Sequence, residues 1–256
     1  MEIGFTTVTF RKKSPEKIVA IALKNDIKNI EWGGDVHLPP CDIDKAKSLK
    51  ALTDKCGINN FSYGSYYRVG ENDLDKFDKI CAIAHIIGAQ TVRIWLGNKS
   101  SKETSESESE RYVQEIRAMC DIAQRYDLVV ASEFHNNTFN DNGKGAVEFI
   151  QRVGKDNLMT MWQPFGDDQI DIENLIATMP YLREIHVFNW LGNNSRKPLA
   201  QGKKKWTDFL DICNKYCQAL PTKNKDIICV LEFVKGDSAR AFKKDAQTLK
   251  EWLANL

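Results

Sequence analysis

Four polar side chains stand at the ends of apolar, strand-like runs that lie far apart in the sequence. Glu133 follows the run Leu-Val-Val-Ala-Ser, Glu232 follows Ile-Ile-Cys-Val-Leu, and Gln163 and His186 end two more such runs. The loops that follow the strands of an eight-stranded β/α barrel converge on one face, so these residues would meet there. Their oxygen and imidazole donors suit a divalent ion of Mn, Mg, Co or Zn, and carboxylates can also transfer protons.

The two glutamates need a compensating charge. A carboxylate within a parallel barrel is costly unless it is paired or bound to a metal, and Glu133 and Glu232 would repel each other across the barrel mouth. A divalent cation between them removes that cost. Arg93 on the fourth run or Lys235 after the eighth could also do so, but neither accounts for His186. The sequence therefore predicts a metal site.

Short runs rich in Val, Ile and aromatic residues alternate with amphipathic segments of helical period. Strands are expected over Ile3–Phe10, Ile27–Trp32, Ile58–Tyr63, Thr91–Leu96, Leu128–Phe134, Leu158–Gln163, Glu184–Trp190 and Ile227–Phe233. Helices are expected from Pro15, over Ile43–Lys55, Leu74–Ile87, Ser107–Tyr126, Ala146–Val153, Ile172–Thr178, Trp206–Leu220 and Ala239–Leu253. Eight alternations predict an α/β fold, a single (β/α)8 TIM barrel over residues 1–256. A doubly wound open sheet is the alternative, but no glycine-rich turn follows the first strand.

Several segments together resemble the sugar phosphate isomerase/epimerase superfamily of xylose isomerase-like barrels, over the whole chain. The matching segments are Ile30-Glu-Trp-Gly-Gly-Asp-Val-His37, Ser62-Tyr-Gly-Ser-Tyr-Tyr67, Gly88-Ala-Gln-Thr-Val-Arg93, Glu133-x-His135, Ile185-His186-Val-Phe and Leu231-Glu232-Phe. They are more specific for the superfamily than for any one substrate.

The resemblance implies a metal tetrad of Glu133, Gln163, His186 and Glu232. The family pattern has Asp where this chain has Gln163, and an amide carbonyl is a weaker ligand for a hard cation. The implied activity is isomerisation or epimerisation of a sugar or sugar phosphate. Glu133 and Glu232 would be the acid and base, and the metal would stabilise an ene-diolate.

Further polar and aromatic residues are candidates for contact with a small sugar substrate. They are His37, Arg93, His135, Trp162 and Lys235. Each has a structural alternative: Arg93 can form a salt bridge with a ligand glutamate, His37 can cap a loop, and aromatic residues can simply pack at the barrel rim. Lys203, Lys204 and Lys205 follow the seventh strand, where cations would suit an anionic substrate or a solvated loop.

Two other functions stay open. A lyase of the dehydroshikimate-dehydratase type resembles the chain at Glu133-x-His135 and at Arg93, which could bind a carboxylate. A sugar-binding barrel without catalysis is suggested by Gln163. Activity on carboxylated rings rather than on sugars would separate the lyase from the isomerase.

Composition limits the classes of partner and compartment. The 256 residues carry a net charge of +1, which gives no electrostatic footprint for nucleic acid or a membrane surface. No run of about 18 apolar residues is present. Seven scattered cysteines, an odd number, argue against a disulfide framework, so a cytoplasmic protein is expected. Such barrels often pair through their outer helices, and a homo-oligomer is left open.

Overall fold

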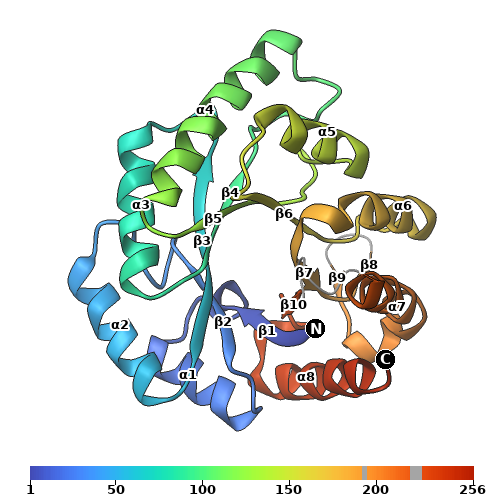
Figure 1. Ribbon diagram of the computed structural model, residues 1–256. Helices are drawn as coiled ribbons and strands as arrows, with labels where there is room; N and C mark the ends of the chain where they lie inside the picture. The colour runs from blue at the N-terminus through green and yellow to red at the C-terminus, as the bar shows by residue number, and fades with distance from the viewer. Residues whose placement is uncertain (192–194, 220–226) are drawn as a thin grey trace.

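The computed structural model describes residues 1–191, 195–219 and 227–256. Eight parallel strands close into a barrel in the order β1-β10-β7-β6-β5-β4-β3-β2, and helices surround them (Figure 1). The barrel strands are β1 (Glu2–Thr6), β2 (Asn29–Gly33), β3 (Asn59–Arg68), β4 (Thr91–Trp95), β5 (Val129–Ser132), β6 (Leu158–Trp162), β7 (Leu182–Val187) and β10 (Ile228–Leu231). The short strands β8 (Trp190–Leu191) and β9 (Ser195–Arg196) form an antiparallel ribbon after β7. The predicted (β/α)8 barrel is confirmed.

The outer layer consists of helices that each follow a barrel strand. They are α1 (Pro15–Lys24), α2 (Ile43–Lys55), α3 (Leu74–Ile86), α4 (Glu106–Gln124), α5 (Gly143–Val153), α6 (Asp168–Thr178), α7 (Lys203–Ala219) and α8 (Ala239–Ala254). Short 3-10 turns are η1 (Thr7–Phe10), η2 (Met179–Tyr181), η3 (Leu199–Gly202) and η4 (Lys235–Asp237). The expected end of the seventh helix at Leu220 lies outside the described residues. No helix in the described part of the chain is both long and apolar enough to cross a bilayer.

Polar side chains cap the N-termini of several helices, where a loop ends and the helix begins. Asp42, Asp73 and Asn142 each accept a hydrogen bond from the backbone N–H three residues on. Such caps satisfy N–H groups that have no partner within the helix. Ser105 and Glu108 form a reciprocal capping box at the start of α4. The starts of these helices are therefore stabilised by residues next to them in the sequence.

The barrel interior differs from the core between strands and helices. The large outer core is apolar, whereas Phe61, Ile228 and Val230 form a small separate cluster. Strand register places Val230 beside His186 and Ile228 beside Glu184. Because residues paired in register share a face of the sheet, both polar residues point with this cluster into the barrel.

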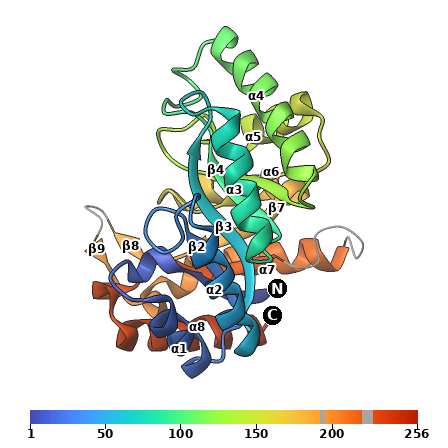
Figure 2. The ribbon, with the colours of Figure 1, turned by 90° about the vertical axis from the view of Figure 1, so that its left-hand side faces the viewer.

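The two largest differences from the expected strand ends lie in β1 and β3. The strand expected over Ile3–Phe10 ends at Thr6, because the next residues form η1 and their hydroxyls accept backbone N–H groups from other strand ends. Thr7 accepts from Gly33 at 2.9 Å, and Thr9 accepts from Phe233 at 3.0 Å. Strand β3, beside α2 and α3 in Figure 2, runs past the expected Tyr63 to Arg68. Its two register shifts let it bend around the barrel rim.

Candidate active site

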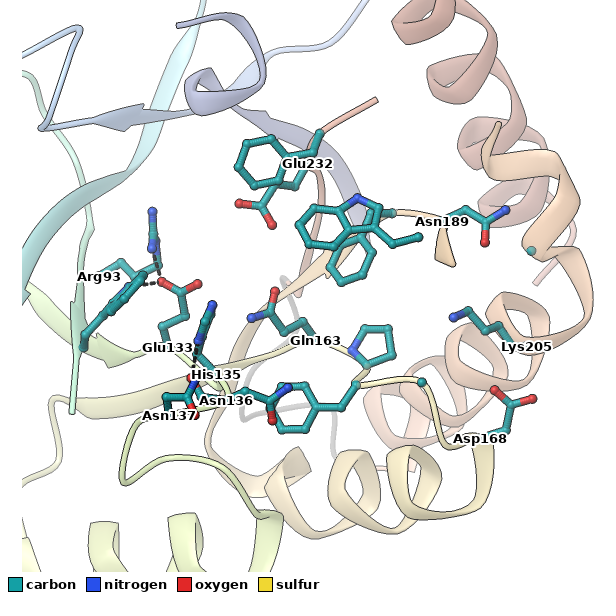
Figure 3. Close-up of a pocket in the computed structure, with 18 of the residues that line it drawn as sticks. Arg93, Glu133, His135, Asn136, Asn137, Gln163, Asp168, Asn189, Lys205 and Glu232 are labelled. Atoms are coloured by element: carbon teal, nitrogen blue, oxygen red, sulfur yellow. Dashed lines mark hydrogen bonds and ion pairs between the residues drawn. The ribbon is translucent and has the colours of Figure 1, made fainter. Parts of the chain in front are cut away.

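A cavity of about 1150 Å³ opens at the carboxyl ends of the barrel strands (Figure 3). Glu133 follows β5 directly, Gln163 follows β6 and Glu232 follows β10, and all three line the cavity. Strands β5 and β10 are separated by β6 and β7 in the eight-stranded circle. The two glutamates therefore approach the cavity from different sides, as Figure 3 shows.

Arg93 connects Glu133 to a second buried carboxylate, Glu31. Its Nε lies 3.0 Å from Glu31 Oε2 and its Nη2 3.2 Å from Glu31 Oε1, while its Nη1 donates to Glu133. Trp95 Nε1 also donates to Glu133. Although burial opposes the charged form, the two carboxylates hold the pKa of Arg93 well above its usual range. Arg93 is thus the counter-ion that sequence analysis considered for Glu133, and its two carboxylates fix its position.

A glycine makes room for this guanidinium. A Cβ atom at Gly64 would lie 2.5 Å from Arg93 Nη2 and 3.3 Å from the Glu31 carboxyl carbon. Ser62, two residues earlier on β3, donates to Glu31 at 3.0 Å. The register shift in β3 before Ser62 brings this hydroxyl to the barrel interior.

His186 lies beneath the cavity and does not line it. It is fully buried, and its Nδ1 lies 3.2 Å from Glu232 Oε2. Burial alone would lower the pKa of His186, but the neighbouring Glu232 carboxylate raises it to about 9. The second ring nitrogen, Nε2, is buried and has no hydrogen-bond partner.

Glu184 is a further buried carboxyl group on the same strand face as His186. Both of its oxygens are buried without a hydrogen-bond partner. Burial and the nearby Glu31 carboxylate raise the pKa of Glu184 to about 8. Among the described residues, one group of three or more His, Cys, Asp and Glu side chains could hold a metal ion: Glu31, Glu184 and His186.

The predicted metal tetrad is not gathered into one group. Glu133, Gln163 and Glu232 share the cavity, but His186 lies below it and Glu133 is bonded to Arg93. The Gln163 amide nitrogen donates to the Phe134 carbonyl at 2.8 Å, so its oxygen is turned away from that strand end. The neutral amide of Gln163 and the cation bonded to Glu133 both weaken the attraction of these four residues for a divalent ion in this arrangement. The tetrad stays a prediction.

The predicted substrate contacts divide into two sets. Arg93 and His135 line the cavity, and the His135 ring stacks on Trp95 with centroids 4.8 Å apart. His37, Trp162 and Lys235 are not among the lining residues, so their contact with a substrate stays a prediction that the cavity does not support. His37 is buried, with Nε2 3.2 Å from the Lys13 carbonyl oxygen, and Trp162 packs outside the barrel against Phe209.

Cations gather on the wall of the cavity away from Glu133. Lys204 and Lys205, from the first turn of α7, line it, and Figure 3 shows the Lys205 amine turned inward above Asp168. Arg11 also lines the cavity and donates to the Tyr66 hydroxyl at 2.7 Å. The lysine run in the sequence indicated an anionic ligand as one alternative, and two of its lysines do reach the cavity.

Two buried aspartates on helices hold the loops that form this wall. Asp171 of α6 accepts the backbone N–H groups of Phe165 and Gly166 at 2.7 and 2.9 Å. Asp245 of α8 accepts the Leu199 N–H at 2.9 Å. Burial raises the pKa of both carboxyl groups. The loops after β6 and β7 are therefore fastened to the outer helices.

Sequence reasoning missed Glu31 and Glu184 as site residues. Glu31 stands within the segment that matched the superfamily, and Glu184 is the first residue of a strand-like run, where a charged residue is ordinary. The alternation of faces gave a usable signal, since Glu184 and His186 are two residues apart and share a face.

Removal of the Arg93 charge tests its role as the shared counter-ion. We expect Arg93→Met to lower the free energy of unfolding by about 3–5 kcal/mol, because Glu31 and Glu133 would stay buried without a cation. Adding Glu31→Gln should recover part of that loss. Denaturant unfolding measures both. The matched control is Arg125→Met, which breaks an exposed ion pair with Asp78 and should cost less than about 1 kcal/mol. Equal losses in the two single variants would contradict the assignment.

Comparisons with known proteins agree with the geometry. The family model described as "Xylose isomerase-like TIM barrel" matches residues 2–216. A 3-dehydroshikimate dehydratase from Bacillus anthracis is 24% identical over 205 residues, which cover 74% of this chain and 72% of that protein. The crystal structure of a probable 3-DHS dehydratase of petrobactin synthesis, also from Bacillus anthracis, superposes with a TM-score of 0.80 at 18% identity, covering 98% of this chain and 99% of the other. An L-ribulose 3-epimerase structure gives a TM-score of 0.74 at 12% identity, covering 100% and 95%.

Proposed function

Because the chain belongs to the family of xylose isomerase-like TIM barrels, we propose that it is an enzyme that removes a proton from the carbon next to a carbonyl group. The best-supported reaction is elimination of water from a small, hydroxylated carbonyl compound that carries a carboxylate. This is the lyase alternative of the sequence analysis, and the relationship to a 3-dehydroshikimate dehydratase supports it.

The distribution of charge in the cavity carries the proposal. Glu133 and Glu232 supply carboxylates from two sides, and Lys204 and Lys205 supply ammonium groups from the α7 wall. A neutral sugar offers these lysines only hydroxyl groups. A carboxylate gives them a charge-assisted partner, which is roughly twice as strong as a neutral hydrogen bond.

The residues of the cavity can perform the proton transfers of such an elimination. One of the two glutamates takes the proton from the carbon beside the carbonyl. The electron pair of that C–H bond forms a C=C bond as the C–O bond to the neighbouring hydroxyl group breaks. The departing oxygen takes a proton and leaves as water. Arg93 and Trp95 hold Glu133 and His186 holds Glu232, so both carboxylates are oriented before substrate arrives.

Epimerisation of a ketose is the second candidate. It begins with the same proton removal, and the approach of Glu133 and Glu232 from different strands would let one take the proton and the other return it to the opposite face. This was the function that the sequence favoured first. The two reactions differ in whether water is lost.

Direct assay of both substrate classes tests the proposal. With 3-dehydroshikimate, loss of water yields an aromatic acid whose ultraviolet absorbance rises, with and without added Mn²⁺. We expect Glu232→Gln to lower this rate by at least about a hundredfold, because an amide cannot accept the proton. Glu251→Gln, on the exposed face of α8, should leave the rate unchanged. Exchange of ketose protons in D₂O without any dehydration would instead establish the epimerase.

The lysines provide a separate test of the anionic substrate. We expect Lys204→Met with Lys205→Met to raise KM for the carboxylated substrate about tenfold or more, since a hydrogen bond to a charged group contributes about 1.5–3 kcal/mol. The kcat should fall less, because these side chains are not placed to move protons. Lys203→Met is the matched control: it is the neighbouring lysine and does not line the cavity. An unchanged KM in the double variant would place the carboxylate elsewhere.

A further inference from the structure

One buried carboxyl group in the barrel has no visible compensation. Glu184 is fully buried, and neither of its oxygens has a hydrogen-bond partner. The nearby cation Arg93 is already bonded to Glu31 and Glu133. An ionised carboxylate in such surroundings costs several kcal/mol unless a cation or hydrogen-bond donors reach it.

A second buried atom without a partner lies in the same place. His186 Nε2 has no hydrogen-bond partner, whereas Nδ1 of the same ring faces Glu232. Ligand atoms of Glu31, Glu184 and His186 all lie within 4.8 Å of one another. Ligand atoms bound to a tetrahedral Zn²⁺ at about 2.0–2.2 Å lie roughly 3.3–3.6 Å apart, so side-chain movements of about 1 Å would close the group around an ion.

The group also contains a carboxylate where the predicted tetrad lacks one. The tetrad has the neutral Gln163 in place of an aspartate, and its Glu133 is bonded to Arg93. Glu184 is two residues before His186 on β7 and shares its face. The negative charge that the tetrad lacks at Gln163 is therefore available from Glu184, which lies deeper in the barrel and on the same strand face as His186.

We propose that a divalent cation such as Zn²⁺ or Mn²⁺ binds below the cavity floor, held by Glu184 and His186 with Glu31 as third ligand. Glu31 keeps its bonds to Arg93 and Ser62, because Oε2 accepts from Arg93 Nε and Ser62, while Oε1, which accepts from Arg93 Nη2 at 3.2 Å, has a second lone pair for the ion. This site is distinct from the tetrad that the family resemblance implies, and it shares only His186 with it.

Binding at Nε2 has a consequence for the cavity. An imidazole that ligates a metal through Nε2 carries its proton on Nδ1, and here Nδ1 faces Glu232. The deep ion would therefore fix His186 as a hydrogen-bond donor to Glu232 and so orient that carboxylate at the cavity floor. His186 acts as a positioning residue in this arrangement.

Metal binding to chelator-stripped protein tests the site without any assay of activity. Calorimetric titration with Zn²⁺ or Mn²⁺ and metal analysis after dialysis should show one ion per wild-type chain. We expect Glu184→Gln to weaken binding by at least about a hundredfold, since even residues that only support ligands contribute ten- to a hundredfold. The matched variant Glu133→Gln alters the predicted tetrad and reaches the deep group only through Arg93, so it should change the affinity less than about threefold.

A spectroscopic variant locates the ion directly. Glu184→Cys loaded with Co²⁺ should show a cobalt–thiolate charge-transfer band, because thiolate is a good ligand for such ions, and Glu133→Cys should not. Circular dichroism and denaturant unfolding confirm that each variant is folded. The proposal is overturned if wild type binds no ion, or if Glu133→Gln loses the ion while Glu184→Gln keeps it.

Discussion

Two buried carboxylates share one guanidinium in this barrel, and much of the site depends on that arrangement. Arg93 forms a fork with Glu31 and reaches Glu133 with its remaining nitrogen. Removal of either carboxylate would still leave Arg93 paired with the other one. Removal of Arg93 would leave two buried negative charges without a counter-ion, because this one cation lowers the energy of both. The absence of a side chain at Gly64 follows from this need for space. The orientation of Glu133 toward the cavity is thus set by charges below it.

The barrel could be predicted because the sequence patterns of its strands and helices are local and recur eight times along the chain. Short runs such as that before Glu232 are too apolar for an edge strand, and the helices between them carry one apolar stripe. The ends of the strands were harder to predict from the sequence. Whether Thr7–Phe10 continues β1 depends on hydroxyl groups that bond the ends of strands far away in sequence, and β3 is extended by register shifts that leave no mark in its composition. These features arise only when the circle of strands closes.

The candidate site was predictable where polar residues end apolar runs, and less so elsewhere. Glu133, Gln163 and Glu232 were found by this rule and line one cavity. Trp162 lies outside the cavity because adjacent residues of a strand face opposite sides, and its neighbour Gln163 faces the cavity. Glu184 escaped attention because a charge at a strand start is commonplace, whereas its burial becomes visible only in three dimensions.

The tethers made by Asp171 and Asp245 divide the cavity into two independently supported parts. Glu133 and Glu232 directly follow barrel strands, while the loops of the wall that bears the lysines are anchored to helices through backbone N–H groups. Because these aspartates accept hydrogen bonds from backbone N–H groups, they do not require particular side chains in the loops. The residues between the tethers can therefore be exchanged while the loop path is kept. In evolutionary terms, such a wall can change its side chains without a change in the barrel beneath it, which is one way in which a single fold comes to serve many functions.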